Sequence, residues 1–191
     1  MILNPKIITH PHIPKPLHGM NPRSILGDIW WNKTRKEAYD RYNNHCISCG
    51  VHKTEAKKYK WLEAHENYSI NYETGQVNII SIEPLCHYCH NFIHSGRLQM
   101  IEGKEKTRIE VIEILNHGLD ILRKNTLNGF YLTIDYAESL GLNVRDVGRC
   151  NTGTLNIKMA DWDKWHLLLE GEKYFSKFKN YEEWKKYYNI K

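Results

Sequence analysis

The stretch LCHYCHNFIH, residues 85–94, places side chains that bind transition metals at half of its ten positions. A second Cys-x2-Cys pair lies upstream, with 36 residues between the two pairs. Two such pairs can present four thiolates to one zinc ion in a tetrahedral arrangement. The sequence therefore predicts a structural zinc (Zn2+) site, whose ligands are Cys46, Cys49, Cys86 and Cys89.

The histidines of the same stretch remain available for a second site. His90 and His94 are four residues apart, so both imidazoles lie on one face of the short helix that we expect to begin at residue 90 and to end near Gly96. A third ligand, His65, lies near the end of the strand expected over residues 59–66. Three histidine ligands with open positions for water and substrate are typical of a catalytic metal rather than a structural one.

The pattern of apolar residues around these motifs predicts a mixed α+β fold. Apolar and polar residues alternate on either side of a turn at Thr74-Gly75, which predicts a β-hairpin over residues 68–82. The capping-box spacing of Thr34 and Glu37 predicts a helix before the first cysteine pair. A second, amphipathic helix is expected from about residue 105 to 124, because apolar residues recur there at intervals of three and four, namely Ile109, Ile112, Leu115, Leu119 and Leu122.

We expect four segments along the chain. Residues 1–27, rich in proline, should form an extended N-terminal arm, whose histidines are not expected to be ligands because an irregular segment has no fixed geometry. Residues 28–100 should form the zinc module with its leading helix, and residues 101–127 a connecting helix. Residues 128–191 should form a small α-rich C-terminal domain. Its aromatic and lysine residues from Tyr174 to Tyr188 either contact nucleic acid or belong to two amphipathic helices with solvated lysines.

The charge and the lack of long apolar runs limit the function classes. Lysine and arginine total 27 against 22 acidic residues, and the excess is concentrated in residues 1–45, with a lysine-rich loop following. A positive field suits a polyanion, so we expect nucleic-acid contacts from Arg35, Lys36, Lys53, Lys57, Lys58 and Arg97. The proline-broken start resembles no signal peptide, and four of the five cysteines fall into pairs with metal-ligand spacing. We therefore expect a cytoplasmic protein with no membrane partner.

Three motifs between residues 45 and 95 form a larger pattern. They are Cys46-x2-Cys49-Gly50, Leu62-Glu63-Ala64-His65-Glu66, and Pro84-Leu85-Cys86-x2-Cys89-His90 with His94. Together they resemble the HNH endonucleases of the ββα-metal type that carry an added four-cysteine zinc, enzymes also found in phages and mobile elements. The resemblance implies a ββα-metal fold and hydrolysis of DNA phosphodiester bonds, with a second divalent metal (Mg2+, Mn2+, Ni2+ or Zn2+) held by His65, His90 and His94.

Two positions depart from the pattern of that family. Glu66 stands where the resemblance places the general-base histidine, and Ser81 where it places the asparagine that orients this base. A carboxylate at position 66 can accept a proton from water, because a nearby metal cation keeps it ionised at neutral pH. The resemblance therefore assigns the catalytic positions to His65 and Glu66, with Glu66 as a substitute base. An alternative register makes His65 the base and leaves Ala64 at the ligand position.

The departures leave more than one function open. The first hypothesis is a metal-dependent endonuclease acting on DNA. The second is an HNH-like zinc module without hydrolytic activity that binds nucleic acid or a protein partner, for example as a phage factor acting on a host system. A third, a zinc-dependent base-modifying enzyme, requires His-x-Glu and Pro-Cys-x2-Cys. That spacing is not met, since His65 directly precedes Glu66 and Leu85 separates Pro84 from Cys86.

Overall fold

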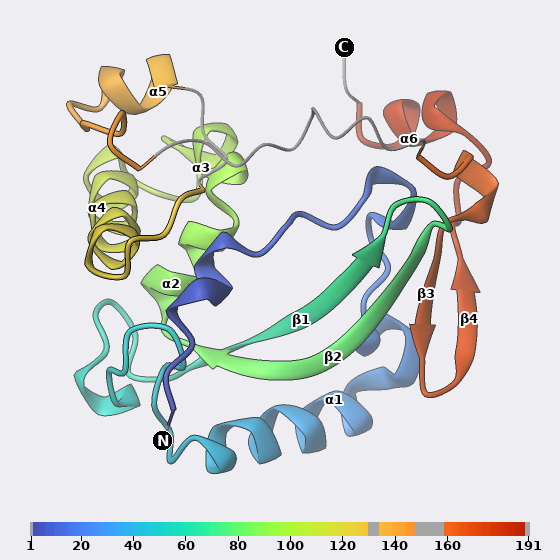
Figure 1. Cartoon of the computed structure of the whole chain (residues 1–191), viewed down its shortest axis with the longest axis horizontal. Helices are drawn as coiled ribbons and strands as arrows, with labels where there is room; N and C mark the ends of the chain where they lie inside the picture. Colours follow the sequence, from blue (N-terminus) through green and yellow to red (C-terminus); the bar gives the residue numbers. More distant parts are fainter. Residues whose placement is uncertain (1, 130–133, 148–158, 190–191) are drawn as a thin grey trace. The chain divides into compact units, whose positions relative to one another are not determined.

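The computed structural model describes residues 2–129, 134–147 and 159–189 of the chain. These residues form a mixed α+β fold with one four-stranded sheet (Figure 1). The helices are α1 (Pro22–Arg41), α2 (His87–Ile93), α3 (Ser95–Ile101), α4 (Arg108–Lys124), α5 (Ile134–Ser139) and α6 (Tyr181–Tyr187). The strands are β1 (Glu63–Asn71), β2 (Gln76–Leu85), β3 (His166–Leu169) and β4 (Glu172–Phe175), and four 3-10 helices are η1 (Pro5–Thr9), η2 (Lys15–Leu17), η3 (Lys53–Glu55) and η4 (Trp162–Lys164).

The chain divides into two compact units, each with its own apolar core. The first unit combines the residues up to Pro11 with Glu37–His65 and the described residues from Glu83 to 147. Its core includes the fully buried Leu85, Phe92, Ile114, Leu115 and Leu119. The second unit combines His12–Lys36, Glu66–Ile82 and the described residues from 159 onwards, around a core of Leu17, Val77, Trp165, Leu167 and Leu169.

The sheet has the strand order β1-β2-β3-β4. The turn that joins β1 to β2 is held by Asn71, whose side-chain oxygen accepts hydrogen bonds from the backbone N–H groups of Glu73 and Thr74 at 3.1 and 3.0 Å. Gly75 ends this turn with φ +73°, a left-handed conformation that glycine adopts without strain. The hairpin expected over residues 68–82 is thus present, extended at both ends (Figure 1).

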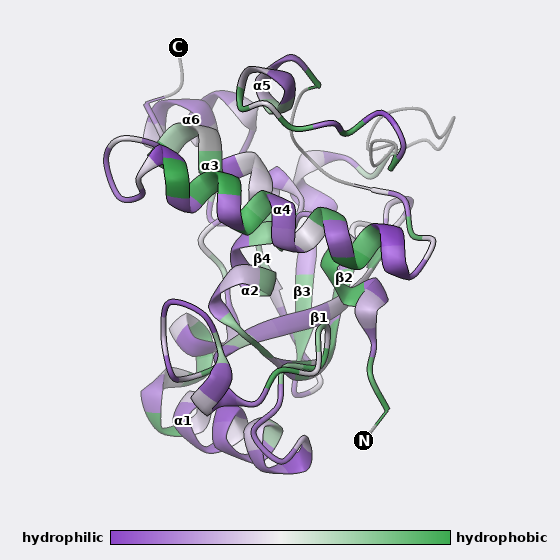
Figure 2. Cartoon of the chain, turned by 90° about the vertical axis from the view of Figure 1, so that its left-hand side faces the viewer, coloured by the Kyte–Doolittle hydropathy of each residue, from purple (hydrophilic) through white to green (hydrophobic). Residues whose placement is uncertain are grey.

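The packing of α2 on α4 fixes the helix that carries two of the predicted metal ligands. Thr107 caps the N-terminus of α4 by accepting a hydrogen bond from the N–H of Glu110 at 3.2 Å. The turns of α4 carry both hydrophobic and hydrophilic residues, as expected of an amphipathic helix (Figure 2). At Gly118 the two helices approach so closely that an added Cβ would lie 2.0 Å from Cδ2 of Phe92. Glycine at this position therefore allows α2 to lie against α4.

The C-terminal segment differs from the α-rich domain that we expected over residues 128–191. Among its described residues, 159–189 contain the strands β3 and β4 in addition to α6. The strands are joined by Glu170 and Gly171, with φ +52° and +83°, the positive values that a tight two-residue hairpin turn requires. The short apolar run of β3 then pairs in parallel with β2, with Val77 opposite Leu167. Cys150, the fifth cysteine, lies outside the described residues.

The N-terminal region also differs from the extended arm that we expected over residues 1–27. It contains η1 and η2, and it buries Ile7, Ile8 and Leu17. Helix α1 begins at Pro22 but is interrupted by a kink at Gly27, with φ +81° and ψ 172°, at the expected end of the arm. Thr34 therefore lies inside α1 and not at its N-terminus. No helix among the described residues is long and apolar enough to cross a membrane.

Candidate metal centres

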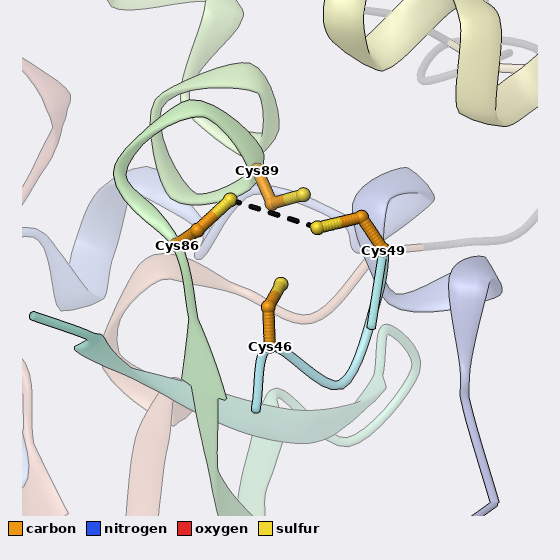
Figure 3. A group of neighbouring side chains, drawn as sticks. All are labelled: Cys46, Cys49, Cys86 and Cys89. Atoms are coloured by element: carbon orange, nitrogen blue, oxygen red, sulfur yellow. Dashed lines mark hydrogen bonds between the residues drawn. The ribbon is translucent and has the colours of Figure 1, made fainter. Parts of the chain in front are cut away.

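The four predicted zinc ligands come together in the first unit. Cys46 and Cys49 lie in a turn that is closed by a 2.9 Å hydrogen bond from the N–H of Gly50 to the carbonyl of Cys46, with Gly50 at φ +77°. Cys86 is the N-cap residue of α2, and Cys89 lies within this helix. The four sulfur atoms lie within 4.8 Å of one another and point toward a common centre (Figure 3).

The distances and the burial of these sulfurs fit a tetrahedral zinc ion. Sulfur ligands about 2.3 Å from one zinc ion in a tetrahedron lie about 3.8 Å apart. The Sγ atoms of Cys49 and Cys86 are separated by 3.8 Å. Cys46 and Cys89 are fully buried, and burial raises the pKa of the Cys89 thiol well above its usual range. A buried thiolate needs a compensating positive charge, which zinc supplies.

His117 on α4 lies beside the cysteine cluster. Its Nε2 is 3.3 Å from Sγ of Cys89, within hydrogen-bonding range of a sulfur. Neither residue spacing nor motif pointed to His117, because α4 reaches the cluster only through its packing on α2. The N–H of an imidazole at this distance can stabilise a metal-bound thiolate by donating a hydrogen bond to it.

The three predicted histidine ligands also come together, at a second place in the first unit. His65 lies on β1, His90 on α2, and His94 is the residue that ends α2. One ligand atom from each lies within 4.8 Å of the others. The ring centroid of His65 is 5.5 Å from that of His90 and 5.4 Å from that of His94. His65 is buried, whereas His94 is exposed, so the cluster reaches from the interior to the surface.

Two of these histidines have one ring nitrogen engaged by a neighbouring side chain. Nδ1 of His90 is hydrogen-bonded to Oε2 of Glu63. Nε2 of His65 lies 3.4 Å from Nδ1 of His10, and the other nitrogen of His65, Nδ1, is buried without a hydrogen-bond partner among the described residues. Metal-binding histidines have this pattern, in which one nitrogen is held by the protein and the other is available to the ion.

Electrostatics keep His65 in a form that can bind a cation. Burial, with the neighbouring His90, His94 and His10 acting in the same direction, lowers the pKa of His65 well below its usual value. His65 is therefore neutral near pH 7, and only a neutral imidazole binds a metal. Burial alone would raise the pKa of Glu63, but the hydrogen bonds from His87 and His90 outweigh it and lower that pKa to about 2.

A buried polar network extends from Glu63 to α4. Oε1 of Glu63 is 2.6 Å from Nδ1 of His87, and Nε2 of His87 is 3.0 Å from Nζ of Lys106. Lys106 in turn forms a 2.9 Å ion pair with Glu110. Next to this network lies a pocket of about 180 Å³, whose lining includes His90, His94, Arg97 and Lys106. The histidine cluster thus opens onto a cavity that also contains cationic side chains.

The structure distributes the other predicted site residues over both units. Glu66, the substitute base, follows His65 on β1, and because successive strand residues point to opposite faces it lies on the face opposite His65. The Oγ of Ser81 accepts a 3.2 Å hydrogen bond from Nδ2 of Asn67. Arg35 and Lys36 belong to the second unit, and the remaining predicted nucleic-acid contacts to the first, namely Lys53, Lys57, Lys58 and Arg97. The six cations therefore do not belong to one compact unit.

Three residues that contact the histidine cluster or its network were not predicted for such a role. His10 lies on the N-terminal arm, whose histidines we did not expect to have fixed geometry, yet it is 8% exposed and contacts His65. Glu63 precedes His65 by two residues, a spacing that places both on the same face of a strand and could have indicated the contact. Nothing in the sequence around Lys106 indicated this role, because Lys106 lies beside His87 only in the folded chain.

Comparison with known proteins found no similar protein. The chain matches no family model, no curated protein and no solved structure.

Proposed function

We propose that this protein is a metal-dependent nuclease of the HNH type that hydrolyses phosphodiester bonds, with DNA as its substrate. The observation that carries this proposal is the convergence of His65, His90 and His94 beside a pocket whose lining includes both cationic and acidic side chains. Three imidazole ligands leave coordination positions open to water and substrate, which distinguishes a catalytic metal centre from a closed structural one. The cysteine cluster has four ligands and fits a closed site.

The order of the elements supports the ββα-metal assignment. His65 comes from the first strand of a hairpin, β1, and His90 and His94 come from the helix that directly follows its second strand. Cys86 and Cys89 lie at the start of that helix, so a zinc ion at the cysteine cluster would fix the N-terminal end of α2. A zinc ion at the cysteine cluster would therefore also help to hold in place the helix that carries His90.

Different residues of this chain would have different roles in the hydrolysis. A divalent cation held by the three histidines would act as a Lewis acid on a phosphate oxygen and stabilise the departing oxygen. Glu63 holds the ring of His90 in place. The carboxylate of Glu66 is not given the role of base, because it lies on the face of β1 opposite His65. Lys106 and Arg97 line the pocket and would contribute positive charge near a bound phosphate.

Plasmid nicking tests this proposal. The purified protein, already loaded with zinc at the cysteine cluster, is incubated with supercoiled plasmid and Mg2+, Mn2+, Ni2+ or Zn2+. We expect nicking with at least one of these ions and a loss of about 100-fold or more in His90→Ala, because that variant removes a metal ligand. His52→Ala is the matched control, since His52 contacts Thr54 away from the cluster. Absence of nicking with every ion, or equal nicking by His90→Ala, contradicts the proposal.

A second candidate function is a binding module that retains the zinc scaffold without hydrolysis. The observation that favours it is the hydrogen bond between Asn67 and Ser81, because it engages the side chain at the position where the family's base-orienting asparagine is expected. This candidate predicts one tightly bound zinc ion per chain and no cleavage. Metal analysis that finds two tightly bound ions in a protein that also nicks plasmid would exclude it.

A further inference from the structure

A stacked pair of aromatic rings lies on the surface of the first unit. The rings of Tyr59 and Trp61 are nearly parallel, with an interplanar angle of 13° and centroids 4.3 Å apart. Trp61 is 54% exposed. Tyr59 covers one face of the indole, and a side chain that is still 54% exposed differs from a packed core aromatic, because it leaves aromatic surface accessible to a ligand.

The pair is connected to the histidine cluster by a series of contacts. Tyr59 lies edge-on to His87, with ring centroids 4.7 Å apart and an interplanar angle of 81°. His87 and His90 both hydrogen-bond to Glu63, and both line the pocket. A group stacked on this pair would therefore lie a few side chains away from a phosphate at the histidine cluster.

The loop that carries the two rings is anchored on both sides of Tyr59. The N–H of Tyr59 donates a 2.9 Å hydrogen bond to the carbonyl of Lys57, across Lys58 with φ +69°. A tight turn of this kind is rare for a residue other than glycine, and it persists only where surrounding contacts hold it. Lys58 forms a 3.1 Å ion pair with Glu110, and Nζ of Lys60 donates to the carbonyl of Ala56 at 3.0 Å. These contacts pre-organise the aromatic pair.

We propose that Trp61, supported by Tyr59, forms a subsite that stacks one unpaired base of a single-stranded nucleic acid. This subsite rests on the proposed function, because it serves the strand whose phosphate lies at the histidine cluster. An aromatic face binds every base in the same way, since each base has a π-face. Within a duplex both faces of a base are already stacked on neighbours, so only an unpaired base offers a free face. The exposed Lys57 and Lys60 add positive charge beside the rings for the strand's phosphates.

Binding measured apart from cleavage tests the subsite. A fluorescently labelled single-stranded oligonucleotide of mixed sequence is titrated with the zinc-loaded protein without added divalent metal, and anisotropy gives the Kd. We expect Trp61→Ala to weaken binding about 5-fold to 100-fold, the range for loss of one base-stacking contact. Trp61→Phe should stay within about threefold of the original protein, because it keeps an aromatic face. Ile109→Ala, at an apolar residue that is 71% exposed on α4, is the control and should not change the Kd.

The outcomes separate this inference from the proposed nuclease activity. A blunt duplex of the same sequence should bind the original protein and Trp61→Ala with similar Kd values. Unchanged single-strand binding by Trp61→Ala, equal losses on the duplex, or no single-strand binding by the original protein would overturn the subsite, even if the plasmid is nicked. Single-strand binding that depends on Trp61 in a protein that never nicks plasmid would support the subsite and remove the nuclease proposal instead.

Discussion

Glu63 on β1 and His90 on α2 are joined by a hydrogen bond between a carboxylate oxygen and Nδ1, although they are 27 residues apart in the chain. This bond makes Nδ1 of His90 the donor and leaves its Nε2 as the nitrogen that can bind an ion. The carboxylate remains ionised at neutral pH, because the hydrogen bonds from His87 and His90 lower the pKa of Glu63 to about 2 against the effect of burial. A carboxylate held in this state orients the ring and makes it a better ligand.

Glu63→Ala should therefore weaken divalent-metal binding at the histidine cluster by about 10-fold to 100-fold, the usual effect of removing such a partner. Isothermal titration of the zinc-loaded protein with Ni2+ measures this affinity. Glu105→Ala is a suitable control, since Glu105 also lines the pocket but pairs with Arg97 at the surface. If both variants bind Ni2+ as tightly as the original protein, Glu63 does not orient a ligand.

The cysteine cluster should bind one zinc ion that contributes to folding. Cys46→Ser removes a fully buried ligand, and we expect it to lose that zinc and to lower the melting temperature by more than about 10 °C, because binding free energy at such a site is folding free energy. Elemental analysis and thermal denaturation are the measurements. Cys150→Ser, which removes the cysteine outside the two pairs, should retain the zinc. Loss of zinc from both variants would refute the four-cysteine assignment.

Gly118→Ala should destabilise the first unit through a steric clash with Phe92. The added Cβ would lie 2.0 Å from Cδ2 of Phe92, so α2 and α4 must move apart, at a cost of about 1–3 kcal/mol in the free energy of unfolding. Chemical denaturation measures this loss. Combining the change with Phe92→Leu should cost less than the sum of the two single changes, because the smaller side chain relieves the overlap. Additive losses would show that the two residues do not clash.

The second unit should lose stability as the pH falls below about 6.5, because of His18. Nε2 of His18 is 3.2 Å from the carbonyl of Ile13, and its Nδ1 accepts a 3.2 Å hydrogen bond from Nε1 of Trp184, so both nitrogens are engaged in the neutral ring. Burial, assisted by positive charge on His12 and Lys15, lowers the pKa of His18 below its usual 6.5. The unfolded chain thus takes up this proton first, and the contribution of His18 is present above pH 6.5 and lost below it.

Thermal melts of the original protein and of His18→Gln at pH 7 and pH 5 check this dependence. Glutamine can accept and donate at the same place without titrating, so the fall in melting temperature between the two pH values should be smaller in His18→Gln. An equal fall in both proteins would mean that His18 does not contribute to the pH dependence.

Local spacing was sufficient to predict much of the candidate sites. Each Cys-x2-Cys pair spans a single turn of the chain, and so does the interval between His90 and His94. These short spacings predicted which side chains lie close together, and the structure brings them together. The helix expected from about 105 to 124 is confirmed as α4. Its buried face was predicted only in part, since Leu115, Leu119 and Leu122 are buried but Ile109 is 71% exposed. The residues that follow it, Glu110 and Val111, are buried, so Ile109 lies on the solvent-facing side of the first turn.

Contacts between distant segments could not be predicted in the same way. His10 meets His65 across 55 residues, and Val77 pairs with Leu167 in parallel β2 and β3. Such contacts depend on the whole arrangement of the elements, and no periodicity in either segment specifies its partner. The hairpin turn at Glu170 and Gly171 was a local signal that we did not use, because the surrounding aromatic and lysine residues suggested helices.

The parallel pairing of β2 with β3 sets an order of events during synthesis of the chain. The last of the proposed metal ligands is His94, whereas β3 begins only at His166. At about 5–20 residues per second, on the order of ten seconds pass between the synthesis of β2 and the synthesis of β3, the strand that pairs with its other edge. During that interval its unpaired edge is a template for another nascent chain, so a product truncated before β3 should be prone to aggregation.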